Sequence, residues 1–235
     1  MDRSRLATSL VALPIIALLV ALGTWQLQRL AWKEDIIATM DARLAQAPVP
    51  LAEALTRPPA EREWQRVMAT GTYLHDRQVA MYRMSVDGEP GYLILTPLRL
   101  ADGRTILVNR GFVPPGLVEP ELRPGSEPDG EVWVVGVLRG GETQLTFTND
   151  NDPATGAWYW YDLPALGTAM GTDLLPGVIH ADRDPAATWP VGGQAIFSPR
   201  NDHLQYALTW YGLAGVALVI YVLLLAKRPA RRPQP

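Results

Sequence analysis

One short stretch of the sequence places an imidazole and two aromatic rings at helical spacing beside a long apolar run. His203, Tyr206 and Trp210 lie at positions i, i+3 and i+7, so one side of a helix would present all three side chains. An imidazole nitrogen can bind a transition metal, and aromatic rings can pack against a flat apolar group. The stretch is therefore a candidate site for a planar cofactor that contains a metal, with His203 as the candidate ligand.

A simpler interpretation of the same residues needs no ligand. Tyrosine and tryptophan are enriched where helices meet the surface of a membrane, so Tyr206 and Trp210 could form an ordinary interfacial belt. His203 would then be a polar residue at the start of a helix. Taken alone, the residue types favour this interpretation over a cofactor site.

The residues after the imidazole form an apolar segment long enough to cross a membrane. From Leu204 to Ala226 no residue is charged, and a helix of that length covers roughly 34 Å against about 30 Å of hydrocarbon. We predict a transmembrane helix over 201–226 and a basic tail over 227–235. Gly212 and Gly215, with Ala214, would allow a second helix to pack closely.

A second apolar segment, Leu6–Leu22, lies near the beginning of the sequence. A cleaved signal peptide is one explanation, since basic residues precede it and Ala21–Gly23 resembles a small-residue cleavage site. The apolar run is longer than that of a typical signal peptide, and Trp25 and Trp32 are typical of a membrane interface. We therefore expect an uncleaved transmembrane helix within residues 1–32.

The distribution of basic residues predicts how the chain crosses the membrane. Arg3 and Arg5 precede the first apolar segment, and four basic residues follow the second. Because basic flanks stay on the cytoplasmic side, we expect both termini in the cytoplasm and residues 33–200 outside. Only five residues precede the first span, too few for a mitochondrial presequence, so we expect a bacterial inner membrane and a periplasmic domain.

The composition excludes several functional classes. The termini carry six of the 21 basic residues but one of the 24 acidic residues, so the remainder is acidic by about eight charges, which argues against nucleic-acid binding. The absence of cysteine excludes thiolate catalysis, cysteine-bound metals and disulfides. The sequence has no nucleophile-elbow motif, and its three histidines lack zinc-ligand spacing. We therefore expect a protein that is not an enzyme.

Residues 33–200 are expected to form a mostly antiparallel β domain with short helices. Lys33–Gln46 continues the first helix with an amphipathic pattern, Asp102-Gly103 predicts a tight turn between strands, and Leu163–Met170 predicts a short helix. The expected strands are Arg66–Tyr73, Gln78–Met84, Tyr92–Leu100, Arg104–Val113, Glu131–Arg139, Ala157–Tyr161 and Gly177–His180. The predicted fold class is a membrane protein whose N- and C-terminal transmembrane helices flank this domain.

Arg29 lies between two tryptophans near the outer end of the first helix. Trp25, Arg29 and Trp32 are spaced by four and three residues, so they can share one helical face. If the two membrane helices pack together, Arg29 and His203 lie at the same outer level, where the guanidinium could pair with an anionic group such as a haem propionate. Snorkelling toward water also explains Arg29, without any ligand.

Four sequence blocks occur in an order known from one protein family. They are Gly23–Arg29 with Trp32-Lys33, Gly91–Leu98, Val108–Pro114 and Asn201–Tyr211. Together they resemble the Surfeit (Surf-one type) family of cytochrome c oxidase assembly factors, which also has two membrane anchors. The resemblance covers residues 23 to 211. Phe112 stands where tryptophan is frequent in the family, an aromatic exchange that we expect to matter little.

The resemblance implies an assembly factor that delivers or inserts haem a into the large subunit of the oxidase, near the haem a synthase. Bacterial relatives are regarded as haem a binders, and the histidine that opens their second membrane helix corresponds to His203, the expected iron ligand. Tyr206 and Trp210 are expected to pack against the macrocycle. Arg29, with Trp25 nearby, is expected to meet a propionate. Neither membrane segment holds a second histidine, so the iron would be five-coordinate or share a ligand from a partner.

A different interpretation gives the β domain the main role. A scaffold that binds no haem could stabilise an oxidase assembly intermediate through protein contacts made by Asn109–Gly111 and Gly91-Tyr92. Glycine and asparagine also favour turns, so these residues have a structural explanation that we prefer to direct contact. A colourless protein that still co-purifies with the oxidase large subunit would favour the scaffold.

Overall fold

The computed structural model describes residues 3–195 and 201–226. The chain divides into a helical unit, Met1–Thr39 with Pro199–Pro235, and a compact unit, Met40–Ser198. The sequence-based boundary at residue 33 falls inside the first helix, which continues without a break into the compact unit. The basic tail predicted over 227–235 lies outside the described residues.

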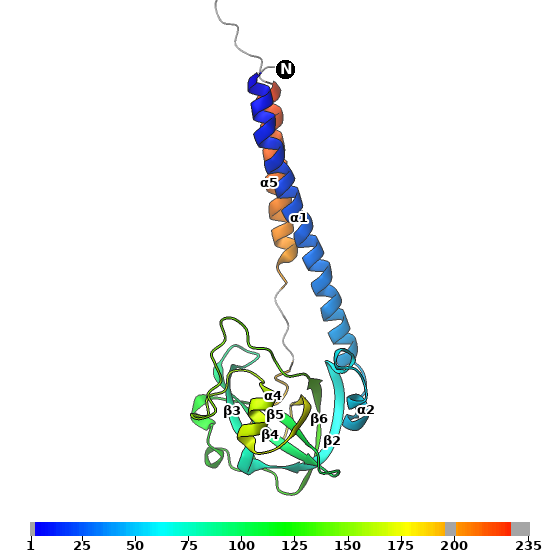
Figure 1. Ribbon diagram of the computed structural model, residues 1–235, viewed down its shortest axis with the longest axis vertical. Coiled ribbons are helices and arrows are strands. Elements are labelled where there is room, and N and C mark those ends of the chain that lie inside the picture. Colours follow the sequence, from blue (N-terminus) through cyan, green and yellow to red (C-terminus); the bar gives the residue numbers. More distant parts are fainter. Residues whose placement is uncertain (1–2, 196–200, 227–235) are drawn as a thin grey trace, which may run out of the picture. The chain divides into compact units, whose positions relative to one another are not determined.

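The helical unit consists of α1 (Arg3–Leu44) and α5 (His203–Ala226), which lie side by side (Figure 1). Both are long and apolar enough to cross a membrane. Their outward-facing leucines and valines stay exposed, such as Leu10 at 67% and Leu208 at 65%, as expected for side chains that face lipid rather than a protein core. The chain is therefore a membrane protein with two transmembrane helices that flank a mostly β domain.

Small residues bring α1 and α5 close together. On α5, Ala207 and Ala214 are buried at 1% and 5% exposure, seven residues apart on one face. On α1, a Cβ atom at Gly23 would lie 2.9 Å from the ring of Tyr211. This role was expected for Gly212, Ala214 and Gly215, but beyond the surrounding turns of α5 no described atom lies within 4 Å of the Cβ position of either glycine. The expectation is wrong for both glycines, which lie off the stripe formed by Ala207 and Ala214, and it is confirmed for Ala214.

The compact unit is a β barrel. Its sheet order is β1-β2-β6-β7-β5-β4-β3, and an additional pairing between β2 and β4 closes the five central strands into a ring. Neighbouring strands are antiparallel except for β1 with β2 and β5 with β7. The strands are β1 (Val49–Pro50), β2 (Gln65–Tyr73), β3 (Val79–Met84), β4 (Pro90–Leu100), β5 (Thr105–Val113), β6 (Glu131–Arg139) and β7 (Leu174–Ala181).

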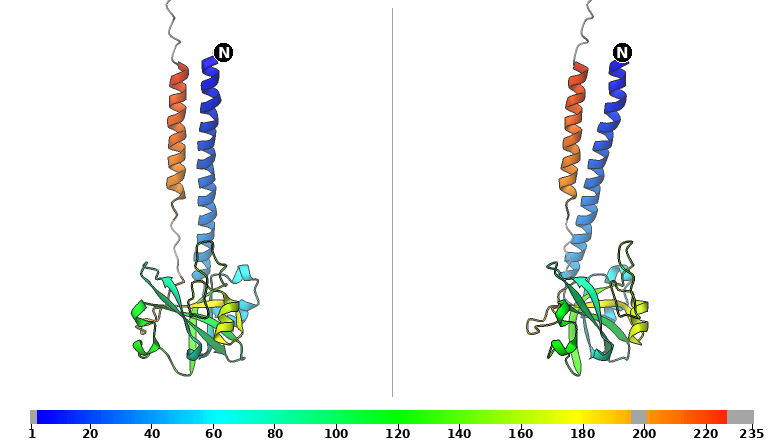
Figure 2. Two further views of the ribbon diagram at one scale, coloured as in Figure 1. Left: turned by 60° about the vertical axis from the view of Figure 1, so that its left-hand side comes forward. Right: turned by 90° about the vertical axis from the view of Figure 1, so that its left-hand side faces the viewer.

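Short helices cover the barrel. The α-helices are α2 (Leu51–Leu55), α3 (Pro59–Arg62) and α4 (Leu163–Met170), and the 3-10 helices are η1 (His75–Arg77), η2 (Pro115–Leu117) and η3 (Pro120–Leu122). Helix α4 begins where Asp162 Oδ1 accepts a hydrogen bond from the Ala165 amide, and it ends at Gly171, whose φ of 61° is left-handed. Figure 2 shows α4 against the outside of the barrel.

Two hydrophobic cores lie on opposite sides of the barrel wall. The inner core receives side chains from all five central strands, including Val67, Leu98 and Ile179, and is closed by Leu51 and Ala54 of α2. The outer core packs α4 against β3, β4, β5 and β7. Strand β5 lies between the two cores and is buried on both faces, which explains its nearly continuous apolar sequence.

Most predicted strands are confirmed within two or three residues, and the helix over Leu163–Met170 and the turn at Asp102-Gly103 are confirmed. The strand expected at Ala157–Tyr161 is wrong, since this segment makes only isolated bridges. Two of its backbone N–H groups bond to side chains rather than to a neighbouring strand: Asn151 Oδ1 accepts from Tyr159 at 2.8 Å, and Glu142 accepts from Tyr161 at 3.3 Å. No local pattern in the sequence indicates β1 or α3.

Candidate cofactor site at the start of α5

His203 is the first residue of α5, and its side chain contacts α1. The imidazole Nδ1 lies 2.7 Å from Oε1 of Gln26. An amide oxygen can only accept, so Nδ1 carries the hydrogen and donates it. In a neutral imidazole the other nitrogen, Nε2, then keeps its lone pair, which is the form that binds a metal. Among the described residues, Nε2 has no hydrogen-bond partner.

Trp210 and Tyr206, the other two residues of the predicted stripe, differ in how far they are exposed. Trp210 is half-buried on the α5 face that carries His203 and Ala207, whereas Tyr206 is 55% exposed. Within the described ranges no ring stacking joins Tyr206 to Trp210. The start of α5 thus presents a half-buried imidazole and indole, with an exposed phenol ring beside them.

Arg29 stacks on its neighbouring tryptophan. Its guanidinium carbon lies 4.0 Å from the centroid of the Trp32 ring, a cation–π contact. Trp25 and Trp32 are 51% and 53% exposed, so apolar surface remains open on both sides of Arg29. Gln26 and Arg29 are three residues apart and share a face of α1. Arg29 therefore lies about one helical turn beyond the Gln26 contact with His203.

A tyrosine next to the site fixes the register of the two helices. The Tyr211 hydroxyl lies 2.9 Å from Thr24 Oγ1, while Thr24 donates its own hydrogen to the Val20 carbonyl. Tyr211 must therefore be the donor in this pair. Its ring also packs over Gly23, where a side chain would collide with it. These contacts hold the helical turn that includes Gln26 opposite the start of α5.

A second tyrosine repeats this arrangement near the other end of the pair. Tyr221 Oη lies 2.8 Å from Ser9 Oγ, and Ser9 donates to the carbonyl of Arg5 at 2.9 Å. Tyr221 is again the donor. Polar pairs inside a bilayer lack competition from water, so the two tyrosine contacts and the Gln26 contact specify one antiparallel register.

Gln26 is the residue that sequence reasoning missed. It lies inside the first family block, but no role was assigned to it there. The signal that could have found Gln26 is its spacing. It belongs to a row of α1 residues that are at least partly buried and follow one another by three or four positions: Ser9, Ala12, Ile16, Leu19, Gly23 and Gln26. An amide on the helix-facing stripe of a membrane span needs a partner, and His203 supplies it.

The glycines and the asparagine of the β-domain blocks have structural roles. A side chain at Gly91 would come within 2.4 Å of Phe112, and Gly111 has φ +130° with the backbone of Val191 2.3 Å from its Cβ position. Asn109 is buried, and its Oδ1 accepts from the Gly111 amide at 2.9 Å. These contacts agree with the structural explanation and leave Gly91, Asn109 and Gly111 no exposed contact surface.

Asn109 belongs to a buried polar network with His180 and Tyr161. Asn109 Nδ2 lies 3.0 Å from Tyr161 Oη and 3.2 Å from His180 Nδ1. Burial, with smaller contributions from Arg139 and Arg83, lowers the pKa of His180 to about 3. The imidazole is therefore neutral and accepts from Asn109. The network is closed to solvent and holds the barrel together.

Comparison with known proteins agrees with this architecture. The model of the SURF1 family matches residues 13–215, which include most of α1, the whole barrel and the first half of α5. A SURF1-like protein of Monosiga brevicollis is 37% identical over 93% of this chain and 87% of its own length. Surfeit locus protein 1 of Xenopus tropicalis is 38% identical over 86% of this chain and 70% of its own, and that of Homo sapiens is 35% identical over 94% and 77%. The chain therefore belongs to the SURF1 family.

Proposed function

We propose that this protein is a membrane-anchored assembly factor of cytochrome c oxidase that carries haem a and passes it to the oxidase large subunit. The observation that carries the proposal is the hydrogen bond from His203 Nδ1 to Gln26, which leaves Nε2 as the free, unprotonated nitrogen. Membership of the SURF1 family supports the assembly role. Haem a is cargo in this proposal, and the protein performs no reaction on it.

Each residue of the site has a defined part in the proposal. His203 binds the iron through Nε2, and Trp210 and Tyr206 pack against the macrocycle. Arg29, held over Trp32, neutralises a propionate, and the exposed ring of Trp25 covers apolar haem surface. A single protein ligand suits a carrier, because one coordinate bond is released more readily than two.

The proposed location follows from the charge of the chain ends. Both termini lie in the cytoplasm, and the β domain lies on the periplasmic side of a bacterial inner membrane. In this arrangement the start of α5 lies at the outer surface of the bilayer. Haem a synthase, a membrane enzyme, would load the carrier there, and the large subunit of the oxidase would receive the haem.

The test is a spectrum of the purified protein. We would solubilise the full chain in detergent from cells that make haem a, then measure absorption and haem stoichiometry for the wild type, His203→Ala and Gln205→Ala. Gln205 is exposed two residues further along α5 and is the matched control. The proposal expects haem a in the wild type and the control, and its loss from His203→Ala with the fold retained. Unchanged haem content in His203→Ala would refute it.

A scaffold that binds no haem is the second candidate function. The observation that favours it is an unpaired sheet edge on the β domain, described below. The same purification separates the two candidates: a colourless wild type that still co-purifies with the oxidase large subunit supports the scaffold, and a haem-loaded wild type supports the carrier.

A further inference from the structure

The wall of the barrel has an opening beside β6. Along one side β6 pairs with β2 over its whole length, Glu131 to Leu138. On the other side β7 covers only Gly136–Arg139, and one further bond, from the Asp182 amide to the Val135 carbonyl, extends the ladder by one residue. Over Glu131–Val134 no described residue pairs with this side of β6. The first half of β6 is therefore an open edge.

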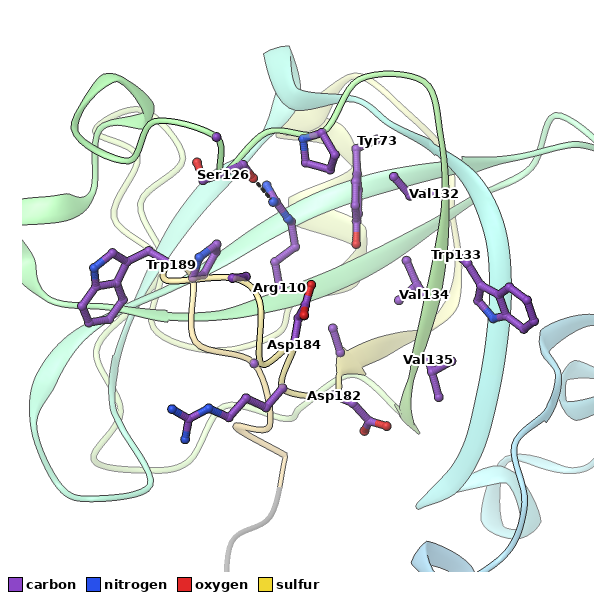
Figure 3. Close-up of a pocket in the computed structure, with 17 residues that line it drawn as sticks. Tyr73, Arg110, Ser126, Val132, Trp133, Val134, Val135, Asp182, Asp184 and Trp189 are labelled. Carbon is purple, nitrogen blue, oxygen red and sulfur yellow. Dashed lines mark hydrogen bonds between the residues drawn. The ribbon is translucent and has the colours of Figure 1, made fainter.

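The open edge presents backbone groups in a definite pattern. In an antiparallel strand, successive residues direct their N–H and C=O groups to alternate sides. Val135 directs its carbonyl toward β7, so Trp133 directs both of its backbone groups to the open side. Its indole is 70% exposed and points away from the opening, whereas Val132 and Val134 face into it (Figure 3).

A pocket of about 550 Å³ lies along this edge. The segment Asp182–Gly192 forms its opposite wall, and Arg110 and Tyr73 lie within it (Figure 3). On the β5 side the wall is complete, because Phe112 and Val191 exchange two backbone hydrogen bonds of 2.9 Å. Open backbone groups therefore remain on the β6 side of the pocket.

Arg110 brings a positive charge and an unpartnered donor nitrogen into the pocket. One terminal nitrogen donates to the Ser126 carbonyl, and the guanidinium carbon lies 4.9 Å from the centroid of the Tyr73 ring. The other, Nη1, has no partner, and Arg110 forms no ion pair with any described residue. Burial raises the pKa of Tyr73 to about 12, so its phenol is neutral. Burial also lowers the pKa of Arg110, and the Glu127 carboxylate offsets part of that effect without forming an ion pair with Arg110.

Neither carboxylate of the pocket wall forms an ion pair with Arg110. Asp182 forms an ion pair with Arg66, and Asp184 Oδ1 accepts from the Ala186 amide at 2.9 Å. A buried Arg123, at 2% exposure, donates to Ser126 Oγ, and the carboxylates of Glu127, Glu119 and Glu121 act on its charge. The group left without an acceptor is Nη1 of Arg110, and a guanidinium forms a stronger hydrogen bond with a carboxylate than with a neutral group.

We propose that the open edge of β6 binds an extended, acidic segment of a partner protein as an added strand, with an Asp or Glu side chain directed at Arg110. Main-chain hydrogen bonds to Trp133 provide affinity in such a complex, and alternate side chains provide specificity. Side chains of the added strand that point to the same side as Val132 and Val134 enter the pocket. This surface belongs to the β domain alone and does not depend on haem binding.

The probe is an array of short degenerate peptides that differ only at a central Glu, Asp, Gln or Lys. Full-length protein in detergent is applied as the wild type and as two pairs of variants. Arg110→Gln is compared with Arg110→Lys, which keeps the charge. Trp133→Pro, which removes the outward N–H and which an edge strand tolerates, is compared with Trp133→Thr, which removes only the indole.

The expected result is at least about tenfold stronger binding of the Glu and Asp peptides than of the Gln peptides. Arg110→Gln should abolish this preference and Arg110→Lys should keep part of it. Trp133→Pro should lose binding about tenfold or more relative to Trp133→Thr. Equal binding of Glu and Gln peptides, unchanged binding by Trp133→Pro, or no binding to any peptide would overturn the proposal. If Trp133→Pro does not fold, the comparison of Arg110→Gln with Arg110→Lys tests the proposal by itself.

Discussion

The imidazole Nδ1 of His203 on α5 lies 2.7 Å from Oε1 of Gln26 on α1. The two residues are 177 positions apart in the chain, and the packing of the two helices brings them together. Because the amide oxygen accepts, the contact selects the tautomer in which Nε2 is unprotonated. The first membrane helix therefore orients the side chain that we propose as the iron ligand on the second.

Gln26→Ala should weaken haem binding without removing the ligand. The imidazole would lose the acceptor that fixes its ring and tautomer, and such partners are typically worth about 10- to 100-fold in affinity. The measurement is a haem titration of the full chain in detergent, together with the iron–histidine stretching frequency from resonance Raman spectra. Gln26→Glu keeps an acceptor oxygen and should retain haem, with a raised stretching frequency because a carboxylate makes the imidazole more basic.

Leu27→Ala is the control for both variants, since Leu27 is 39% exposed on the neighbouring position of α1. It should bind haem as the wild type does. If Gln26→Ala binds haem with unchanged affinity and an unchanged stretching frequency, Gln26 does not position His203. If His203→Ala also keeps its haem, the proposed function itself fails, so the two failures can be told apart.

Gly23→Ala should loosen the helix pair, whereas Gly212→Ala should not. Both substitutions add a methyl group to a membrane helix, and alanine favours a helix over glycine by about 1 kcal/mol. At Gly23 the new Cβ would lie 2.9 Å from the Tyr211 ring, while at Gly212 nothing lies within 4 Å. We expect a loss of about 1–3 kcal/mol for Gly23→Ala and no loss for Gly212→Ala, measured by unfolding in mixed SDS micelles. Equal stability of the two variants would contradict the packing described here.

Much of this architecture follows from the sequence because the signals are local. An uncharged run from Leu204 to Ala226 predicts a membrane helix wherever it occurs, and Asp102-Gly103 predicts a turn because Gly103 readily adopts the positive φ of +85° that it has. Boundaries were predicted within a few residues for the same reason. The strand predicted at Ala157–Tyr161 is wrong, because the amides of Tyr159 and Tyr161 donate to the side chains of Asn151 and Glu142 and not to a neighbouring strand.

The site depends on contacts that no local pattern encodes. His203 could be singled out from its place at the start of an apolar run, but its partner Gln26 lies on another helix, and only the antiparallel register joins them. The open edge of β6 is similarly nonlocal. It arises because β7 ends at Ala181, and nothing within Glu131–Val134 indicates that its neighbour is short.

Gly111→Ala should destabilise the β domain far more than Gly103→Ala. Both glycines have positive φ, +130° and +85°, so both variants carry backbone strain of about 1–3 kcal/mol. Gly103 has open space at its Cβ position, whereas at Gly111 the backbone of Val191 lies 2.3 Å away and cannot yield without breaking its pairing with Phe112. Thermal unfolding of the full chain should show the larger loss at Gly111. A similar melting temperature for both variants would contradict the packing of Gly111 against Val191 described here.

Burial of His180 should make the β domain sensitive to mild acid. Its pKa is about 3 in the folded protein and 6.5 in the ordinary state, so below pH 6.5 the unfolded chain binds a proton that the folded chain does not. The stability that comes from keeping His180 neutral is complete above pH 6.5. It falls by about 1.4 kcal/mol for each pH unit below that value.

The measurement is thermal unfolding of the full chain between pH 7.5 and about pH 5, above the range where most carboxylates titrate. His180→Gln should be less stable than the wild type at pH 7.5, because the glutamine side chain replaces the imidazole imperfectly in the hydrogen-bonded network with Asn109. Its stability should nevertheless change less with pH, since the titrating group is gone. His75→Gln, which replaces a half-buried histidine bonded to the Pro128 carbonyl, is the control for removing a histidine outside the network. If His180→Gln keeps the slope of the wild type, the acid sensitivity of the domain arises from another group.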